Sequence, residues 1–144
     1  MQIKNLNGIT DAQMDQLMGI WLSSNLASHD FIQPEYWRHQ REAVAKELRE
    51  DDVIAVMDED DETILGFAML DGEVVRGVYT KTTDQRKGVG GMLMFALKAT
   101  HNHLKLSVFQ ENEAATAFFQ HHGFKTATAH KDETVGEEMW EMKL

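Results

Sequence analysis

The sequence has 144 residues, of which 42% are hydrophobic and 26% charged, and this is the composition of one soluble globular domain spanning 1–144. The lack of cysteine excludes disulfide bonds and a thiolate metal site, and the net charge of −10 excludes the broad basic surface of a nucleic-acid-binding protein. No apolar run is long enough to span a membrane and the N-terminus lacks the pattern of a signal peptide, so we expect a cytoplasmic protein without a membrane partner.

Two helices are predicted in the first third of the chain. Thr10 and Gln13 form a capping-box pair, and the apolar residues that follow recur at helical spacing, which predicts a helix at about 11–26. Pro34 suits the first turn of a second helix, which another set of apolar residues extends to about Arg49.

Three strands are predicted next, because the apolar residues change from helical spacing to continuous runs. These runs cover 53–57, 63–70 and 74–80, and polar turns separate them. Asp71 and Gly72 form a dipeptide that favours a hairpin turn between the second and third runs. This part of the chain therefore predicts a meander of neighbouring strands.

The second half of the chain alternates helices and strands. A helix is expected up to about His101, then a strand at 104–109, then a helix that Gly123 ends as a C-terminal cap. Two closing strands are expected at 124–130 and 137–144. A meander followed by such a crossover predicts a mixed α/β sheet with helices on its faces.

The stretch TTDQRKGVGGMLMFALKAT (82–100) places basic residues and glycines at the start of a helix. The first turn of a helix exposes unpaired N–H groups and the positive end of the helix dipole, and glycines let an anion approach them. Together with Arg86 and Lys87, this pattern favours a phosphate-binding loop. The alternative is that Gly88 and Gly90 only shape a tight turn between a strand and a helix.

Two familiar phosphate loops are excluded by the residues that follow the glycines. A P-loop requires Lys and then Ser or Thr after its last glycine, whereas Met92 follows Gly91. The dinucleotide-binding fingerprint requires a third glycine in register, which GVGGML (88–93) lacks.

A third pattern fits. The segment QRKGVG (85–90) resembles the Gln/Arg-x-x-Gly-x-Gly/Ala signature of the GNAT superfamily of acyl-CoA-dependent N-acetyltransferases, and NEAATAFFQHHGF (112–124) resembles its second signature. The segment IWLSSNLASHDFI (20–32) resembles the first-helix segment of small bacterial members, where it lines the acceptor side. The resemblance implies a GNAT-like α/β fold, with a mixed but mostly antiparallel twisted sheet of about six to seven strands flanked by four helices.

The resemblance also implies a reaction, the transfer of an acetyl group from acetyl-CoA to a primary amine of a small molecule or peptide, without a metal. In the family, the end of the fourth strand holds the pantetheine arm and the acetyl carbonyl, and the signature loop holds the pyrophosphate. An asparagine lies near the pantetheine, and its alternative role here is an N-cap. The residues at these positions, with the ring that faces the thioester, are expected to bind the cofactor: Val78, Tyr79, Thr80, Gln85, Arg86, Lys87, Gly88, Val89, Gly90, Gly91, Asn112 and Phe119.

The candidate catalytic residues include one departure from the family pattern. Phe119 stands where the family has a tyrosine that protonates the leaving thiolate, and a phenyl ring donates no proton. The hydroxyls of Tyr79 and Ser107 are candidate replacements. Glu73 begins the strand where the family often carries its base, although a solvated hairpin residue is the alternative. His29 is a candidate on the acceptor side, and the alternative is a loop histidine without a catalytic role.

Three function classes are left open. The first is an acetyl-CoA-dependent N-acetyltransferase, the second is a related module that senses acyl-CoA with little or no turnover, and the third is another phosphate-ligand protein that uses the same loop. The expected partners are acetyl-CoA and an amine acceptor, in a monomer or homodimer. The acidic surface favours cationic amines by long-range attraction. The paired histidines lack the spacing and carboxylate support of a metal site.

Overall fold

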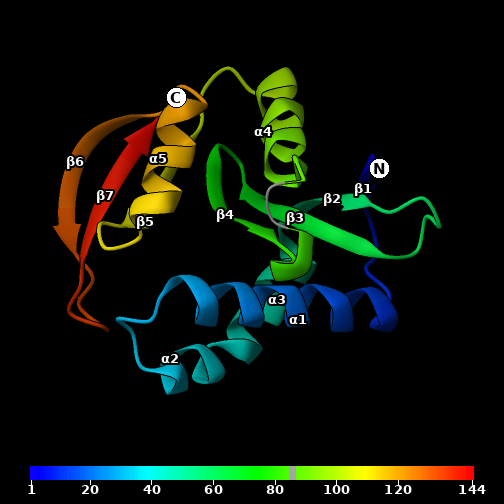
Figure 1. Ribbon diagram of the computed structural model, residues 1–144, viewed down its shortest axis with the longest axis horizontal. Helices are drawn as coiled ribbons and strands as arrows, with labels where there is room; N and C mark the ends of the chain where they lie inside the picture. Colours follow the sequence, from blue (N-terminus) through cyan, green and yellow to red (C-terminus); the bar gives the residue numbers. More distant parts are fainter. Residues whose placement is uncertain (85–86) are drawn as a thin grey trace.

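The computed structural model of the protein describes residues 1–84 and 87–144. Figure 1 shows a twisted sheet with α1, α2 and α3 on one side and α4 and α5 on the other. Within the described chain, seven strands form one sheet in the order β1-β2-β3-β4-β5-β7-β6, in which β4 and β5 are the parallel pair. The strands are Gln2–Leu6 (β1), Asp52–Met57 (β2), Ile64–Asp71 (β3), Val74–Thr80 (β4), Lys105–Phe109 (β5), Lys125–Lys131 (β6) and Glu138–Lys143 (β7).

The helices of the described chain are Asp11–Ser28 (α1), Pro34–His39 (α2), Arg41–Glu50 (α3), Val89–Thr100 (α4) and Glu113–His121 (α5), with a short 3₁₀ turn at Thr82–Asp84. In these same ranges, no helix combines the length and the apolar character that crossing a membrane requires.

Helix α1 starts where its capping box predicts. The Thr10 hydroxyl accepts a hydrogen bond from the backbone N–H of Gln13 at 3.1 Å, and the Gln13 side chain accepts one from the N–H of Thr10 at 3.0 Å. Farther along, the Gln16 side chain donates to the carbonyl of Glu62 at 3.0 Å and accepts from the N–H of Ile64 at 2.8 Å. These bonds fasten α1 to the segment between β2 and β3.

The second predicted helix is divided in two, so the described chain has five helices rather than four. Helix α2 ends at His39 and α3 begins at Arg41, with Gln40 between them at φ −85° and ψ −5°. The N–H of Gln40 is shared between the carbonyls of Tyr36 and Trp37, which is typical of a helix terminus. No proline or glycine marks this break, and the apolar spacing alone did not reveal it.

Strand β1 corrects the sequence expectation, which placed no strand in the first ten residues. It pairs antiparallel with β2, from Gln2 opposite Met57 to Leu6 opposite Val53. Among its five residues only Leu6 is buried. Because β1 is the edge of the sheet and faces solvent, it needs few apolar residues, and this left no pattern to detect.

Strand β2 is buried on both faces, which explains its continuous apolar run. Ile54 and Val56 belong to the core that α4 and α5 cover. Val53, Ala55 and Met57 belong to a second core, which α1, α2 and α3 cover. The sheet therefore separates two apolar layers and is fixed from both sides.

Strands β4 and β5 pair at a single position, Val74 opposite Lys105. Beyond this pair the two strands diverge, and no strand among residues 1–84 and 87–144 pairs with the edge of β4 that would face β5, up to Thr80. Open α/β sheets hold their ligands beyond the carboxyl ends of strands, where neighbouring strands separate. This gap in the sheet contains the candidate site.

Gly66 in β3 allows α4 to approach the sheet closely. A Cβ atom at this position would lie 2.6 Å from Cγ1 of Val89 and 2.8 Å from the carbonyl oxygen of Tyr79. Gly66 also pairs with Thr80 across the two strands. The strand glycine therefore fixes the first turn of α4 directly beside the end of β4.

Candidate active site

A cavity of about 490 Å³, here called the α4 cavity, opens where β4 leaves β5. The end of α1, the end of β4, the start of α4 and one face of α5 form its walls. Lys87 is exposed and does not line it, and the predicted cofactor-binding residues Gln85 and Arg86 lie outside the described residues. The other nine predicted residues line the cavity: Val78, Tyr79, Thr80, Gly88, Val89, Gly90, Gly91, Asn112 and Phe119.

The first turn of α4 presents backbone to this cavity. Gly88 caps the helix in the left-handed conformation, at φ 86°, which side chains disfavour. A Cβ atom on Gly90 would lie 3.1 Å from the ring of Phe118, whereas no atom of the described residues lies within 4 Å of a Cβ built on Gly91. The first N–H groups of a helix have no intrahelical partner and carry the positive end of its dipole. This wall is therefore suited to a phosphate group.

The end of β4 is held by a side chain of α1 in place of a neighbouring strand. The hydroxyl of Ser24, which is 8% exposed, donates a hydrogen bond to the carbonyl of Thr80 at 2.9 Å. Asn25, the next residue, is 3% exposed and donates to the carbonyl of Trp21 at 2.9 Å. Both Ser24 and Asn25 line the α4 cavity, so α1 contributes buried polar groups to the site.

A second cavity of about 280 Å³, here called the inter-strand cavity, lies between the diverging strands β4 and β5. Helix α2 contributes Tyr36 and Trp37 to it, and the turn between β6 and β7 contributes Asp132. The two cavities share seven lining residues, and we call this shared region the junction. The junction consists of Asn25, His29, Val78, Tyr79, Asn112, Ala115 and Phe119.

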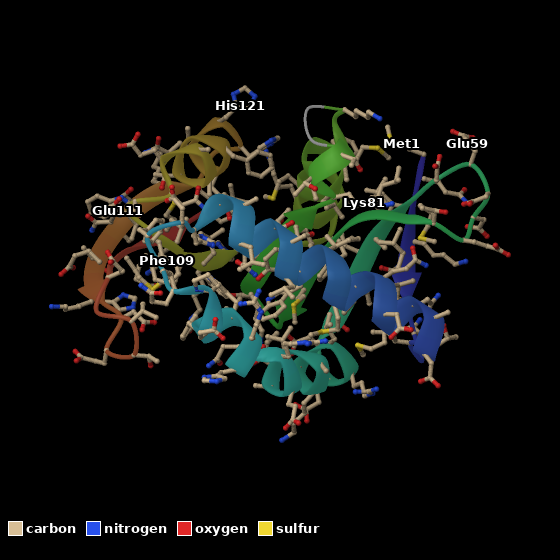
Figure 2. The ribbon with its side chains drawn as sticks, turned by 60° about the horizontal axis from the view of Figure 1, so that its bottom comes forward. Met1, Glu59, Lys81, Phe109, Glu111 and His121 are labelled. Atoms are coloured by element: carbon tan, nitrogen blue, oxygen red, sulfur yellow. The ribbon has the colours of Figure 1, made fainter. Side chains whose placement is uncertain are left out.

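His29 stands at the junction as an uncharged ring. Its Nε2 atom is 3.0 Å from Nδ2 of Asn112. Its ring stacks on Trp37, with centroids 5.1 Å apart, and meets the rings of Phe31 and Phe109 edge to face. Figure 2 labels Phe109, which is the last residue of β5. Burial lowers the pKa of His29 from 6.5 to about 4, so the imidazole is neutral at pH 7.

Tyr79 brings a hydroxyl to the junction. Its ring lies over Gly77, where a Cβ atom would collide with it, and contacts Phe67 at a centroid distance of 5.2 Å. Burial raises the pKa of Tyr79 to about 12. The hydroxyl is therefore neutral at pH 7 and can donate a hydrogen bond, but it is a weak acid.

The other predicted proton donors differ in their availability. Phe119 is 8% exposed and packs against Phe118 and Phe124, so the position of the family tyrosine is occupied by a ring without a donor. Ser107 lines the inter-strand cavity, but its hydroxyl donates to Glu141 at 2.5 Å. Ser107 is consequently already engaged as a donor.

Glu73 is not brought to the junction. It is exposed in the turn between β3 and β4 and lines neither cavity. Its backbone carbonyl accepts a hydrogen bond from Lys105 at the closed end of the gap, at 3.0 Å. Val78, the nearest junction residue along the strand, is roughly 16 Å away at the usual rise of a β-strand.

The histidine pairs of the sequence have packing roles. His122 ends α5 and packs on Phe118 at a centroid distance of 4.7 Å, and Nδ1 of His101 is 3.1 Å from the carbonyl of Leu97. In residues 1–84 and 87–144, no three His, Asp or Glu side chains are grouped so that they could hold a metal ion.

Ser24, Asn25 and Ser28 belong to the segment 20–32, which the resemblance implied would line the acceptor side, but they were not singled out as individual residues. Ser24, Asn25 and Ser28 form a polar stripe at positions i, i+1 and i+4 of a mostly apolar helix, and this stripe was a usable signal. Trp37 and Asp132 come from segments whose local patterns give no indication of a site.

A family model and several known proteins resemble the chain. A family model described as an acetyltransferase (GNAT) domain matches residues 23–144. The peptidyl-lysine N-acetyltransferase YiaC of Escherichia coli (strain K12) is 33% identical over 131 residues, which cover 88% of this chain and 89% of that protein.

Two solved structures show the same fold. The solution structure of apo-form YjaB from Escherichia coli has a TM-score of 0.85 at 24% identity, covering 99% of this chain and 95% of that chain. The PaiA N-acetyltransferase of Thermoplasma acidophilum, solved in complex with coenzyme A, has a TM-score of 0.74 at 16% identity and covers 99% of this chain and 98% of its own.

Proposed function

The chain belongs to the GNAT family of acetyltransferases and is an N-acetyltransferase, and from this we propose that it transfers the acetyl group of acetyl-CoA to the side-chain amine of a lysine in a peptide or protein. The relative YiaC is named for a peptidyl-lysine acceptor. The main support for the proposal is the junction between the two cavities. Two cavities open onto one gap in the sheet, as a reaction between two separate substrates requires.

Acetyl-CoA would occupy the α4 cavity. The volume of about 490 Å³ lies in the range of small-molecule sites, and the first turn of α4 offers open amides for the pyrophosphate. The glycines at 88, 90 and 91 keep side chains away from that anion. Gln85, Arg86 and Lys87 lie in the sequence directly before these glycines, and we expect the two cations to add long-range attraction.

The thioester carbonyl would lie against the unpaired edge of β4. Because β5 pairs with β4 only at Val74, the backbone groups of Val78 have no strand partner on that side within the part of the chain that the structure describes. A backbone N–H that is already in place can stabilise the oxyanion formed when the carbonyl is attacked, without reorganisation during the reaction. The hydroxyl of Ser24 holds this edge through Thr80.

The lysine would enter through the inter-strand cavity and reach the junction as the neutral amine. The amine nitrogen forms a bond to the thioester carbonyl carbon, and the carbon–sulfur bond then breaks with its electron pair leaving on sulfur. Once bonded to that carbon, the nitrogen holds its protons far less tightly than a free ammonium does. The neutral His29 imidazole, a weak base with a pKa of about 4, can then accept one of them.

The departing sulfur does not require the missing tyrosine. A thiol such as cysteine has a pKa of about 8.5, so a thiolate is a tolerable leaving group near pH 7. Transfer from Tyr79, with a pKa of about 12, would be uphill by roughly 5 kcal/mol. We therefore assign Tyr79 a hydrogen-bonding role toward the thioester or its sulfur, and Phe119 the role of an apolar wall.

The test uses peptides with one internal lysine and a blocked N-terminal amine, incubated with the protein and acetyl-CoA. Matched peptides carry norleucine in place of the lysine. We expect thiol release together with an acetylated lysine in the mass spectrum, and neither with norleucine. Thiol release without acetylated peptide would overturn the transfer proposal. Binding of acetyl-CoA by calorimetry without any turnover across a broad peptide and amine panel would favour an acyl-CoA sensor.

The remaining expectations from the sequence stay proposals. We propose that 1–144 is a single domain, that the protein is cytoplasmic, and that it works as a monomer or homodimer without a nucleic-acid or membrane partner. The match of the family model to residues 23–144 supports the single domain.

A further inference from the structure

The two ring nitrogens of His29 make different hydrogen bonds, and the partners determine which nitrogen carries the proton. On one side, Nδ1 is 3.3 Å from the hydroxyl oxygen of Ser28. That hydroxyl donates its single hydrogen to the backbone carbonyl of Ser24 at 2.7 Å, because a carbonyl can only accept. Toward His29 the Ser28 oxygen must therefore accept, and Nδ1 must carry the hydrogen.

The other side of the ring leads to the same tautomer independently. Oδ1 of Asn112 caps α5 by accepting from the backbone N–H of Ala115 at 3.1 Å, which fixes the orientation of the amide. The Nδ2 group of Asn112 therefore points at Nε2 of His29, 3.0 Å away, and an amide nitrogen can only donate. Nε2 must offer its lone pair. Both ends of the ring thus require the same protonation state.

We propose that Ser28 and Asn112 are positioning residues that hold His29 as the Nδ1–H tautomer, with Asn112 donating to the lone pair of Nε2; this rests on the proposed function, in which that lone pair receives the amine proton once the acceptor amine has displaced the Asn112 amide from it. The geometry explains why Nε2 has this role. Nδ1 is bonded back to the last turn of α1, whereas Nε2 faces Asn112 across the junction. His29 and Asn112 each line both the α4 cavity and the inter-strand cavity.

The rings around His29 keep it neutral, and a hydrogen bond to the backbone of Asn25 acts against the lowering of its pKa by burial. The rings of Phe31, Trp37 and Phe109 pack against it from the α1–α2 segment, α2 and β5, and none of them is charged. Asp30 follows in the chain and is exposed to solvent. A proton on Nε2 would face the N–H group of Asn112, which agrees with the lowered pKa of His29.

The tautomer can be measured directly by long-range ¹H–¹⁵N correlation spectra of the free protein at pH 7, with the His29 signals assigned by their absence in His29→Gln. We expect Nδ1 in the shift range of a protonated ring nitrogen and Nε2 in that of an unprotonated one. The reverse pattern, or averaged shifts from exchanging tautomers, would overturn the proposal.

Asn112→Asp tests the positioning role. Aspartate keeps the N-cap but offers only acceptors, so Nε2 should gain a proton and the pKa of His29 should rise by about 1–3 units. The acidic limb of the kcat profile should move to higher pH by the same amount, since the neutral ring is the active form. Asn102→Asp, in an exposed bend far from the site in sequence, is the matched control and should change neither.

Ser28→Ala leaves Asn112 as the remaining partner of the ring and should lower the population of the Nδ1–H tautomer only in part, and Ser28→Thr, which keeps the hydroxyl, should restore the wild-type population. An Asn112→Asp protein with the His29 shifts and pKa of the wild type would overturn the proposal. The spectra need no substrate, so they decide the tautomer even if no lysine peptide is acetylated. In that case the proposed function fails while the positioning of His29 is judged separately.

Discussion

The α4 cavity and the inter-strand cavity meet at one junction but are built in different ways. The α4 cavity depends on backbone, namely the amides of one helical turn and glycines whose missing side chains leave them open. The inter-strand cavity depends on side chains from α1, α2, β4, β5, α5 and the β6–β7 turn. A site made of backbone groups can be predicted from one short segment of sequence. A site made of side chains from several elements is assembled only when the chain folds.

The largest expected effect strikes the backbone-built cavity. Gly90→Glu places a carboxylate and a Cβ atom, 3.1 Å from the Phe118 ring, where the cofactor needs bare amides. We expect acetyl-CoA affinity to fall by on the order of 100-fold, measured by calorimetry. Gly19→Glu on the exposed side of α1, where a Cβ atom meets nothing within 4 Å, is the control. Equal acetyl-CoA affinities for Gly90→Glu and the wild type would show that the start of α4 does not bind the pyrophosphate.

The second prediction concerns the junction, where a substitution should lower kcat and leave the affinity for acetyl-CoA unchanged. His29→Gln removes the nitrogen that accepts the amine proton, and kcat for a lysine peptide should fall by about 100-fold. This is the low end of general base effects, because a group with a pKa of about 4 is a weak base at pH 7. His103→Gln, in an exposed loop, should retain full activity. A His29→Gln enzyme as fast as the wild type would shift the base role elsewhere.

The buried imidazole also makes stability depend on pH. Between pH 6.5 and about 4 the unfolded chain binds a proton at His29 that the folded chain does not, so stability falls as pH falls through this window. Between pH 7 and pH 5, the free energy of unfolding should fall by about 1–2 kcal/mol more in the wild type than in His29→Gln. Urea titrations at both pH values measure this difference. Parallel losses in the two proteins would show that the ring is not desolvated.

The smallest expected effect concerns the apolar wall. Phe119→Tyr adds the hydroxyl that the family carries, and kcat should rise by about 10-fold at most with unchanged acetyl-CoA affinity. The gain is limited because a thiolate already leaves readily near pH 7. Phe95→Tyr, at a side chain that is 77% exposed, controls for the added hydroxyl. A lower kcat in Phe119→Tyr would mean that the wall must be apolar.

The way each cavity is built also decides which of its residues could be predicted from the sequence. The glycine-rich start of α4 and the cap residue Asn112 follow from local rules, and the structure places both at the α4 cavity. Trp37 reaches the inter-strand cavity from α2, a short helix whose end at His39 no local residue signals. Glu73 was selected by its position at the start of a strand, but the length of that strand separates it from the junction.

The fold was predictable to a similar degree and for a similar reason. The elements from α1 to β7 carry caps, turns or apolar runs, and their expected bounds lie within a few residues of the observed ones apart from the division of the second helix. Strand β1 has one buried residue, Leu6, because its place at the edge of the sheet demands no more. An edge strand is defined by its neighbour, β2, and not by its own residues.

The unpaired edge of β4 has a consequence for how this chain avoids self-association. An exposed strand edge in the middle of a sheet is a template on which a strand of another molecule can add. In the folded protein α1 lies against this edge, and Ser24 occupies the carbonyl of Thr80 across 56 positions of sequence. Helix α1 therefore acts as a guard against aggregation as well as a wall of the active site.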